Sequence, residues 1–146
     1  MLAQLHANPL SDMPGVLGEA TCETHRERLV RHLRQALIRS GEACERGHVL
    51  FTDGAWRYLG DRALGAGGQA SLVLRPREIL MAGFALGARG MILAHNHPSG
   101  ECRPSQADLD ATERLRWLGG MVDLALLDHL IVTHSAVYSM RAGGLL

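Results

Sequence analysis

Apolar residues recur along this chain with two different periods, and those periods predict an alternation of helices and strands. Between Thr21 and about Ile38, apolar residues return at spacings of three and four positions among arginines. This spacing predicts an amphipathic helix that ends where Ser40 and Gly41 break the pattern. Ahead of it, residues 1–20 carry prolines and glycines without a regular period, and we expect them to form a loosely ordered arm.

Proline and glycine mark the limits of two further predicted helices. Pro76 suits the first turn of a helix, because its φ is fixed near the helical value and it lacks the N–H that a first turn leaves unpaired. We expect the helix that it opens to end at Gly87. The pair Pro104-Ser105 predicts the start of another helix, which lasts to Leu118 and stops at the two glycines that follow.

Shorter runs of β-branched, aromatic and other apolar residues predict strands. The run HVLFTD (48–53) ends in Asp53-Gly54, a strong turn signal, so this run and the AWRYLGD that follows are expected to pair as a hairpin. The run GMILAH (90–95) is almost entirely apolar, which predicts a strand buried on both faces. Three more strands are expected, at 70–74, 121–133 and 136–140.

The predicted elements follow one another in the order α-β-β-β-α-β-α-β-β. This order indicates an α/β domain with three layers, α-β-α, around a mixed sheet. With 146 residues, no internal repeat and no linker, the chain is expected to hold a single domain over 21–146, preceded by the arm at 1–20. Exposed edges of such a sheet would allow a homodimer.

Composition and charge narrow the class of function. The formal net charge is zero with neutral histidines, so no overall basic field attracts nucleic acid. The arginines between 26 and 39 favour a solvated helix face over a DNA-binding stripe, because glutamates dilute them. Three cysteines without CxxC spacing, Cys22, Cys44 and Cys102, argue against a disulfide framework and fit a reducing compartment. No apolar run approaches the ~20 residues that span a bilayer, so we expect a cytoplasmic protein with no membrane partner.

The stretch MILAHNHPSGECRPSQAD (91–108) carries the candidate chemistry. Side chains alternate along a strand, so His95 and His97 at its end project to one side while Asn96 points away. The proline that follows stops the strand and leaves the two imidazoles beside a loop. Imidazole is a common zinc ligand, and Asp108 in the first turn of the next helix could add a carboxylate. Three such ligands leave one position for water, as catalytic zinc sites do.

Each part of this stretch also has a structural explanation. Ser105-x-x-Asp108 before a periodic apolar segment is a capping box, which alone would account for both residues. A His-x-His at a strand end is weak evidence by itself, since hydrogen-bonded structural histidines are common. The conjunction of a same-side histidine pair, a forced turn and a helix that offers a hydroxyl and a carboxylate favours the metal site. Ser105 can cap the helix and still turn its hydroxyl towards the metal.

The spacing His95-x-His97-x7-Ser105-x-x-Asp108 resembles the motif of the MPN/JAMM metalloproteases. The RadC-type branch in particular is similar over roughly residues 42–142, in the segments ILAHNHPSG, PSQAD, LLDHLIV and VYSM. The resemblance implies a cytidine-deaminase-like α/β fold and hydrolysis of peptide or isopeptide bonds in a peptide or protein substrate. RadC-type chains commonly carry a helix-hairpin-helix segment ahead of this domain. None is recognisable here, so we do not expect association with DNA by that route.

The same resemblance implies roles for the candidate residues. His95, His97 and Asp108 would bind Zn²⁺, and Ser105 would donate a hydrogen bond to the oxyanion that develops during hydrolysis. The alternatives to this enzyme are a DNA-repair accessory of the RadC type and a non-catalytic MPN interaction scaffold.

The family motif also needs a glutamate ahead of an early strand, to hold the attacking water and transfer its proton. Glu45 matches that position, and Glu42 is the alternative if the register is shifted. Glu78 is less suitable, because it lies in the first turn of a predicted helix, where the helix dipole favours a carboxylate in any case.

Two further residues have open roles. Cys102 could be an extra soft ligand or a bystander thiol in the loop after His97. His129 could orient a metal ligand through its neighbour Asp128, or it could be a core histidine bonded to the backbone.

Overall fold

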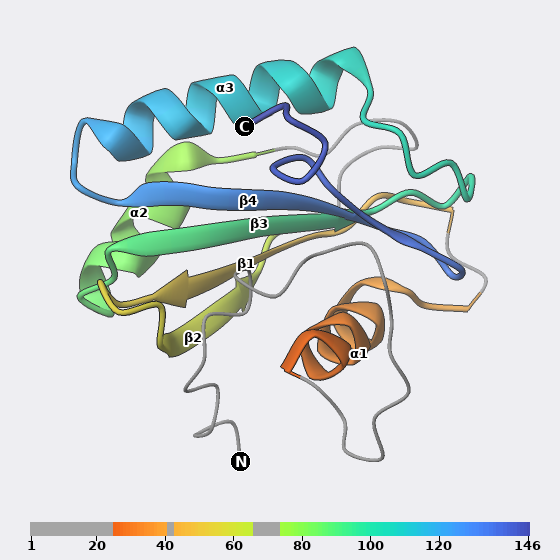
Figure 1. Ribbon diagram of the computed structural model, residues 1–146, viewed down its shortest axis with the longest axis horizontal. Helices are drawn as coiled ribbons and strands as arrows, with labels where there is room; N and C mark the ends of the chain where they lie inside the picture. The colour runs from red at the N-terminus through yellow and green to blue at the C-terminus, as the bar shows by residue number, and fades with distance from the viewer. Residues whose placement is uncertain (1–24, 41–42, 66–73) are drawn as a thin grey trace.

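The computed structural model describes residues 25–40, 43–65 and 74–146 of the chain. These residues form three helices and five strands, and Figure 1 shows their arrangement. In chain order they are α1 (His25–Leu37), β1 (Gly47–Thr52), β2 (Tyr58–Ala63), α2 (Pro76–Ala85), β3 (Gly90–Asn96), α3 (Gln106–Gly120), β4 (Ala125–Val132) and β5 (Val137–Ser139). The arm predicted at 1–20, Glu42 and nearly all of the strand predicted at 70–74 lie outside the described residues.

The described strands form one mixed sheet in the order β2-β1-β3-β4-β5. Strands β3 and β4 run parallel, with α3 as the crossover between them, and the other neighbouring pairs are antiparallel. Helix α1 covers one face of the sheet, whereas α2 and α3 cover the other (Figure 1). This arrangement confirms the predicted three-layer α/β fold. Within the described segments, no helix combines the length and the apolar character that crossing a membrane requires.

Apolar side chains fill the space on both faces of the sheet. On the α1 face, three leucines of the helix pack against β1, β3 and β4: Leu29, Leu33 and Leu37. On the other face, α2 contributes Ile79 and α3 contributes Leu115. Every residue of β3 is buried, as its apolar run predicted. Full burial of one such leucine or isoleucine stabilises the fold by about 1.5–3 kcal/mol, so the two clusters hold the strands that carry the site.

The β1–β2 hairpin differs in detail from its prediction. Strand β2 begins only at Tyr58, because the turn is longer than the Asp-Gly signal predicts. Oδ1 of Asp53 accepts hydrogen bonds from the backbone N–H groups of Ala55 and Arg57, at 2.8 and 2.9 Å. An aspartate that binds the backbone ahead of it favours a turn over strand pairing, and the second strand therefore starts late.

Strand β4 also starts later than predicted. The sequence from residue 121 onwards predicts a strand, but residues 121–123 form a turn after α3. Asp123 adopts a φ of 55°, in the left-handed region. Pairing with β3 begins at Ala125, opposite Gly90, and its register shifts between Met91 and Ile92.

Candidate metal centre

The candidate site lies where β3 ends, beside the segment that leads into β1. In the antiparallel register, Gly47 of β1 lies opposite His95 of β3. Because side chains on one face recur at every second residue, Glu45 lies on the same side of the sheet as His95 and His97. Oε1 of Glu45 is 4.0 Å from Nε2 of His97. The pairing of β1 with β3 thus brings together residues that are far apart in the sequence.

The three predicted metal ligands converge on one point. The Nε2 atoms of His95 and His97 lie 2.9 Å apart. Oδ1 of Asp108 is 3.1 Å from Nε2 of His95, and Oδ2 is 3.3 Å from Nε2 of His97. His95 is fully buried and Asp108 is 5% exposed, whereas His97 lies at the edge of the solvent. These ligand atoms are close enough together to contact a single ion.

A chain of buried hydrogen bonds determines which nitrogen of His95 faces this point. Oγ1 of Thr112 donates its only proton to the backbone oxygen of Asp108 at 2.6 Å, so it accepts the 2.6 Å hydrogen bond from Nδ1 of His129. Burial, together with repulsion from His95, lowers the pKa of His129 to about 3, and this ring is therefore neutral. Its Nε2 then accepts the 2.8 Å hydrogen bond from Nδ1–H of His95. In the neutral ring, Nε2 of His95 is therefore left with a bare lone pair.

The surroundings of His97 orient its ring in the same way. Nδ1 of His97 lies 2.7 Å from the backbone oxygen of Glu101, which can only accept a hydrogen bond, so Nδ1 carries the proton and Nε2 is bare in the neutral ring. The hydrogen bond to Asp108 raises the pKa of His97, although burial opposes it. In the metal-free protein the carboxylate of Asp108 thus favours a proton on Nε2 of His97. The place where the two rings face this carboxylate therefore favours a positive charge.

Ser105 and Asp108 form the predicted capping box, and Asp108 faces the imidazoles as well. The backbone N–H and the hydroxyl of Ser105 each donate to Oδ2 of Asp108 at 2.7 Å. In return, the hydroxyl accepts from the backbone N–H of Asp108 at 3.2 Å. Burial raises the pKa of Asp108, but hydrogen bonds from His95 and His97 outweigh it and hold that pKa well below its usual range. The carboxylate is ionised and fixed in place.

The donor set fits a zinc ion. Zinc binds imidazole nitrogen and carboxylate oxygen at roughly 2.0–2.2 Å in a tetrahedron, which places the ligand atoms roughly 3.3 Å from one another. The two Nε2 atoms lie 2.9 Å apart, and the two oxygens of Asp108 lie 3.1 and 3.3 Å from Nε2 of His95 and of His97, respectively, so these separations are close to this value. Two neutral imidazoles and one carboxylate also leave a fourth position open. Nitrogen and oxygen donors of this kind suit other divalent transition ions too.

Asn96 holds the segment that carries Glu45, and the sequence reasoning missed this role. Its side chain lies on the opposite side of β3 from the two histidines. Oδ1 of Asn96 accepts from the backbone N–H of Arg46 at 2.6 Å, and Nδ2 donates to the backbone oxygen of Cys44 at 3.4 Å. The amide thus binds both neighbours of Glu45. The sequence signal was an asparagine between two same-side histidines, a residue type that can pair with unsatisfied backbone.

His129 does orient a predicted metal ligand, but it does so directly and not through Asp128. It contacts His95 directly, whereas Asp128 accepts a hydrogen bond from the Ser139 hydroxyl at 2.5 Å, outside the candidate site. Thr112, which completes the chain, was not among the predicted residues. Its signal was its position one helical turn after Asp108, on the same face of α3.

Two other candidates have partners elsewhere. Sγ of Cys102 lies 3.4 Å from the hydroxyl of Thr133, and it is not part of the ligand cluster. Glu78 is exposed on α2 and forms an ion pair with Arg75 at 3.1 Å. Glu45 is therefore the glutamate that the described residues bring to the ligands.

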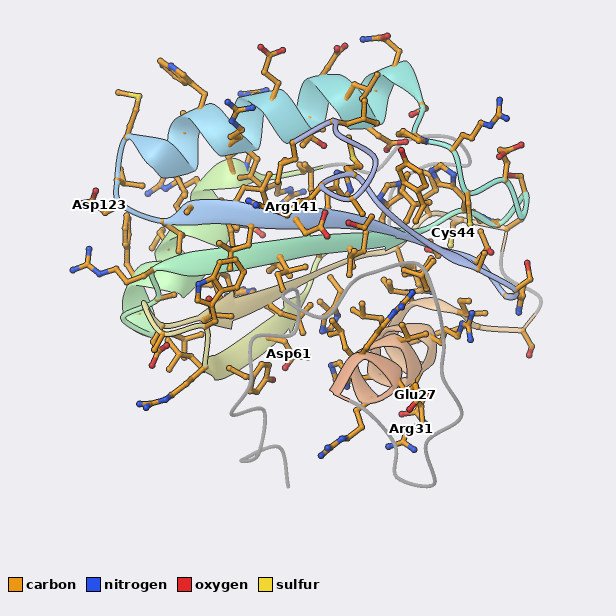
Figure 2. All side chains as sticks on the ribbon, in the orientation of Figure 1. Glu27, Arg31, Cys44, Asp61, Asp123 and Arg141 are labelled. Atoms are coloured by element: carbon orange, nitrogen blue, oxygen red, sulfur yellow. The ribbon has the colours of Figure 1, made fainter. Side chains whose placement is uncertain are left out.

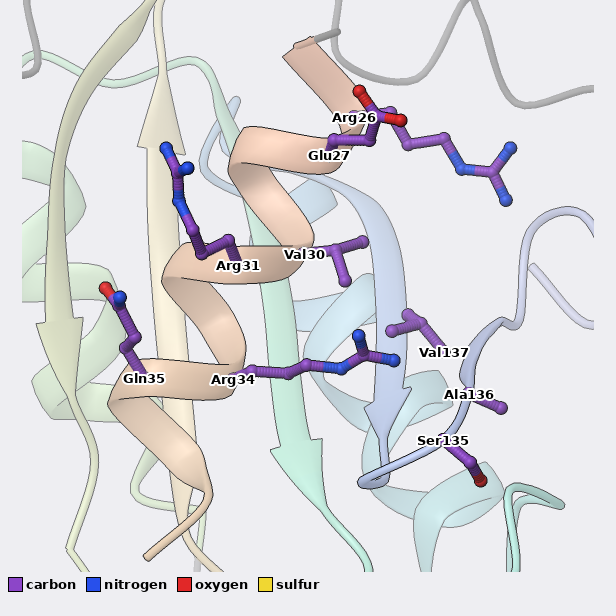
Figure 3. Close-up of a pocket in the computed structure, with 9 residues that line it drawn as sticks. All are labelled: Arg26, Glu27, Val30, Arg31, Arg34, Gln35, Ser135, Ala136 and Val137. Carbon is purple, nitrogen blue, oxygen red and sulfur yellow. The ribbon is translucent and has the colours of Figure 1, made fainter. Parts of the chain in front are cut away.

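One pocket adjoins the candidate site, and a larger one lies on the face of the sheet that α1 covers. A pocket of about 620 Å³ lies between α1 and the start of β5, with Val30, Arg34 and Val137 among its walls (Figure 3). None of the three predicted metal ligands lines it. A pocket of about 80 Å³ adjoins the site, and its lining includes His97 and Thr133. The larger pocket thus belongs to the face that α1 covers, not to the ligand cluster.

Comparison with known proteins gives consistent matches. The sequence profile of a family described as RadC-like JAB domain matches residues 23–145. The UPF0758 protein YkfG of Escherichia coli is 36% identical over 129 residues, which cover 88% of this chain and 79% of that protein. A UPF0758 protein of Flavobacterium johnsoniae is 39% identical over 97 residues, or 66% of this chain and 42% of that protein. For the UPF0758 protein tlr1707 of Thermosynechococcus vestitus the identity is 39% over 100 residues, 68% of this chain and 40% of that protein. The chain spans about two fifths of the length of these last two relatives.

Proposed function

The chain belongs to the family of RadC-like JAB domains, and on this basis we propose that it is a zinc-dependent hydrolase of peptide or isopeptide bonds. The observation that carries the proposal is the cluster formed by an ionised carboxylate and two imidazole nitrogens that are bare in the neutral rings, with separations of 2.9, 3.1 and 3.3 Å. A catalytic metal centre needs three protein ligands, an open position and a base within reach. Glu45, 4.0 Å from His97, supplies the base.

In this proposal the ion is held by Nε2 of His95, Nε2 of His97 and the carboxylate of Asp108. When bound, zinc supplies Lewis acidity and lowers the pKa of a water molecule from ~15.7 to about 7. The three residues hold their positions through partners outside the ligand cluster. His129 and Glu101 orient the two rings, and such partners typically change metal affinity by about 10–100-fold.

Glu45 acts as the general base. Its carboxylate orients the attacking water, accepts the proton during attack on the amide carbonyl and returns it to the leaving amine. The side chain is 12% exposed, so solvent competes little for its oxygens. The bonds from Asn96 to both neighbours of Glu45 keep it directed at the ligand cluster.

Ser105 stabilises the charge that develops on the carbonyl oxygen. In this structure its hydroxyl donates to Oδ2 of Asp108 at 2.7 Å. Rotation of the hydroxyl turns that proton to the substrate oxygen, while the backbone N–H of Ser105 keeps its own bond to Asp108. One hydrogen bond of this kind typically contributes about 3 kcal/mol to transition-state stabilisation.

The decisive experiment combines metal content with hydrolysis. The zinc-loaded chain is incubated with a quenched peptide library that contains both α-peptide bonds and isopeptide bonds to the lysine ε-amine. We expect cleavage by the wild type, and a loss of roughly 10²–10⁴-fold in Glu45→Gln with bound zinc unchanged. Glu78→Gln removes an equal charge at an exposed position, and it should cleave like the wild type.

The metal assignment is tested separately by elemental analysis of His95→Ala and Asp108→Ala. Each variant should lose zinc, because each lacks one of three ligands. Unchanged zinc content in both would end the assignment of this site. A wild type that binds zinc at these residues but cleaves no library member would make the domain an interaction scaffold instead.

A further inference from the structure

A second group of two histidines and an aspartate lies on the other face of the sheet. His32 of α1, His48 of β1 and Asp61 of β2 bring their ligand atoms within 4.8 Å of one another. Nε2 of His32 and Nε2 of His48 each lie 2.6 Å from the same oxygen, Oδ2 of Asp61. Figure 2 shows Asp61 on β2, on the side of the sheet where α1 packs. Each ligand thus comes from a different element.

The fold brings these residues together for simple geometric reasons. In the hairpin, His48 lies opposite Ala63 and Leu50 lies opposite Asp61. His48 and Asp61 are therefore diagonal neighbours on one face, a spacing that side chains can bridge. This face is the one that α1 covers, since Leu50 packs in the α1 cluster. His32 precedes the buried Leu33 and reaches the pair from the helix.

The carboxylate of Asp61 is prepared to act as a ligand. Oδ1 accepts a hydrogen bond from the hydroxyl of Tyr58 at 2.6 Å, and this leaves Oδ2 for the two imidazoles. Burial raises the pKa of Asp61, but hydrogen bonds from Tyr58, His48 and His32 outweigh it and lower that pKa to about 2. Burial and the neighbouring Asp61 raise the pKa of the Tyr58 hydroxyl, so the phenol keeps its proton as a donor. Asp61 is therefore ionised and oriented.

We propose that His32, His48 and Asp61 form a second site for a divalent transition metal ion such as Zn²⁺. The donor set of two imidazole nitrogens and one carboxylate oxygen repeats that of the first cluster and suits borderline ions such as zinc. The side chains of His32 and Asp61 are 30% and 20% exposed, so an ion can enter from solvent and keep a water ligand. A bound ion would join α1 to the β1–β2 hairpin.

The alternative is a metal-free cluster in which both imidazoles only donate hydrogen bonds to Asp61. The two arrangements require opposite tautomers. A carboxylate can only accept, so in the metal-free cluster the proton of each ring is on Nε2. Metal binding needs a bare Nε2 and moves the proton of each ring to Nδ1. The tautomer of His32 and His48 therefore distinguishes the two directly.

The test uses the full chain with the first site removed by His95→Ala and His97→Ala. After chelation and dialysis this variant is titrated with Co²⁺ and with Zn²⁺. We expect one ion per chain, with the visible absorption of a tetrahedral Co²⁺ centre. Long-range ¹H–¹⁵N NMR should show His32 and His48 change from the Nε2–H to the Nδ1–H tautomer when Zn²⁺ is added. This variant lacks two ligands of the first site, so the measured binding does not depend on that site or on the proposed hydrolase function.

Further substitutions in the same background locate the ion. His48→Ala should abolish binding, and Asp61→Asn, similar in volume and partly exposed, should do the same if His48→Ala does not fold. Tyr58→Phe keeps all three ligands and should weaken binding by about 10-fold. His134→Ala removes an exposed loop histidine and should change nothing. Absence of binding to the background variant, unchanged tautomers, or binding that survives both His48→Ala and Asp61→Asn would each overturn the proposal.

Discussion

The tautomer of His95 is set by residues that the local sequence does not bring near it. His129 is 34 positions away along the chain, and Thr112 is 17 positions from His129. His95, His97 and Asp108 could be predicted, because strand alternation and a helix cap place them from short spacings. For His129, a role in orienting His95 could not be preferred over a structural role in the core, because its contact with His95 depends on β4 lying beside β3. The only indication for Thr112 was its position one helical turn after Asp108, and ordinary core residues of the helix show the same spacing.

Thr112→Val tests whether this chain of hydrogen bonds prepares His95 for metal. Valine has nearly the same shape, but it leaves Nδ1–H of His129 without its acceptor. We expect zinc affinity to fall by about 10–100-fold, and the free energy of unfolding of the metal-free protein to fall by about 1–3 kcal/mol. Competition with a chelating dye measures the affinity, and urea titration measures the stability.

The matched control for this prediction is Thr112→Ser, which restores the hydroxyl without the methyl group. If the hydroxyl positions His95 through His129, serine should recover most of the zinc affinity. Equal affinities for valine, serine and wild type would show that Thr112 only packs the interface between α3 and the sheet.

At the scale of elements, the sequence predicted each described helix and strand, and the errors fall at turns. Periodicity reports which face of an element is buried, so it located α1, β3 and α3 well. Turns depend on single side-chain hydrogen bonds, such as those of Asp53 with the backbone ahead of it. A left-handed φ at a residue other than glycine, such as that of Asp123, is also difficult to predict from the sequence. The starts of β2 and β4 were therefore predicted too early.

The end of α3 offers a prediction at this scale, because two adjacent glycines face different surroundings. A Cβ on Gly119 would lie 2.3 Å from the backbone oxygen of Leu124 and 2.8 Å from the Met91 side chain. A Cβ on Gly120 would meet nothing within 4 Å. Gly119→Ala must displace the chain that leads into β4, and it should lower the free energy of unfolding by about 1–3 kcal/mol.

Gly120→Ala is the control for that substitution. It adds the same methyl group in open space and removes a residue that weakens helices, so it should be neutral or stabilising by up to about 1 kcal/mol. Urea unfolding of both variants measures the difference. Equal stability of the two would mean that close packing against Leu124 does not limit this position.

For the whole molecule, the order of strands could not be predicted from the sequence. Local patterns specify a mixed α/β domain, but the position of β3 between β1 and β4 is a long-range property. That order assembles the candidate site: β1 brings Glu45 to the histidines of β3, and β4 brings His129. It also places the two histidine–aspartate clusters on opposite faces of one sheet. The second cluster went unrecognised in the sequence because its three members lie on three separate elements.

The response of the whole fold to pH includes an unusual contribution from a buried acid. Asp128 is completely buried in β4. Burial raises its pKa, although the Ser139 hydroxyl and the backbone N–H groups of Arg141 and His129 donate to it. In the unfolded chain the pKa is near 3.8. At a pH between the unfolded pKa and the raised folded pKa, the folded protein binds more protons than the unfolded chain. The contribution of Asp128 to the free energy of unfolding therefore grows as the pH falls through the folded pKa, and it is complete below about 3.8.

Asp128→Asn should remove that contribution, because asparagine cannot ionise. Its oxygen can still accept from the backbone N–H groups, and its amide nitrogen can donate to the Ser139 hydroxyl, so the fold should persist. The free energy of unfolding of the metal-free protein is measured by urea titration from neutral pH down to about 3.8. Carboxylates with lowered pKa, such as Asp61 and Asp53, titrate in both proteins and cancel in the difference. The wild type should gain stability relative to Asp128→Asn as the pH falls, whereas Asp110→Asn, exposed on α3, should parallel the wild type. Parallel profiles for wild type and Asp128→Asn would mean that the buried carboxyl keeps an ordinary pKa and that its three donors fully offset the cost of burial.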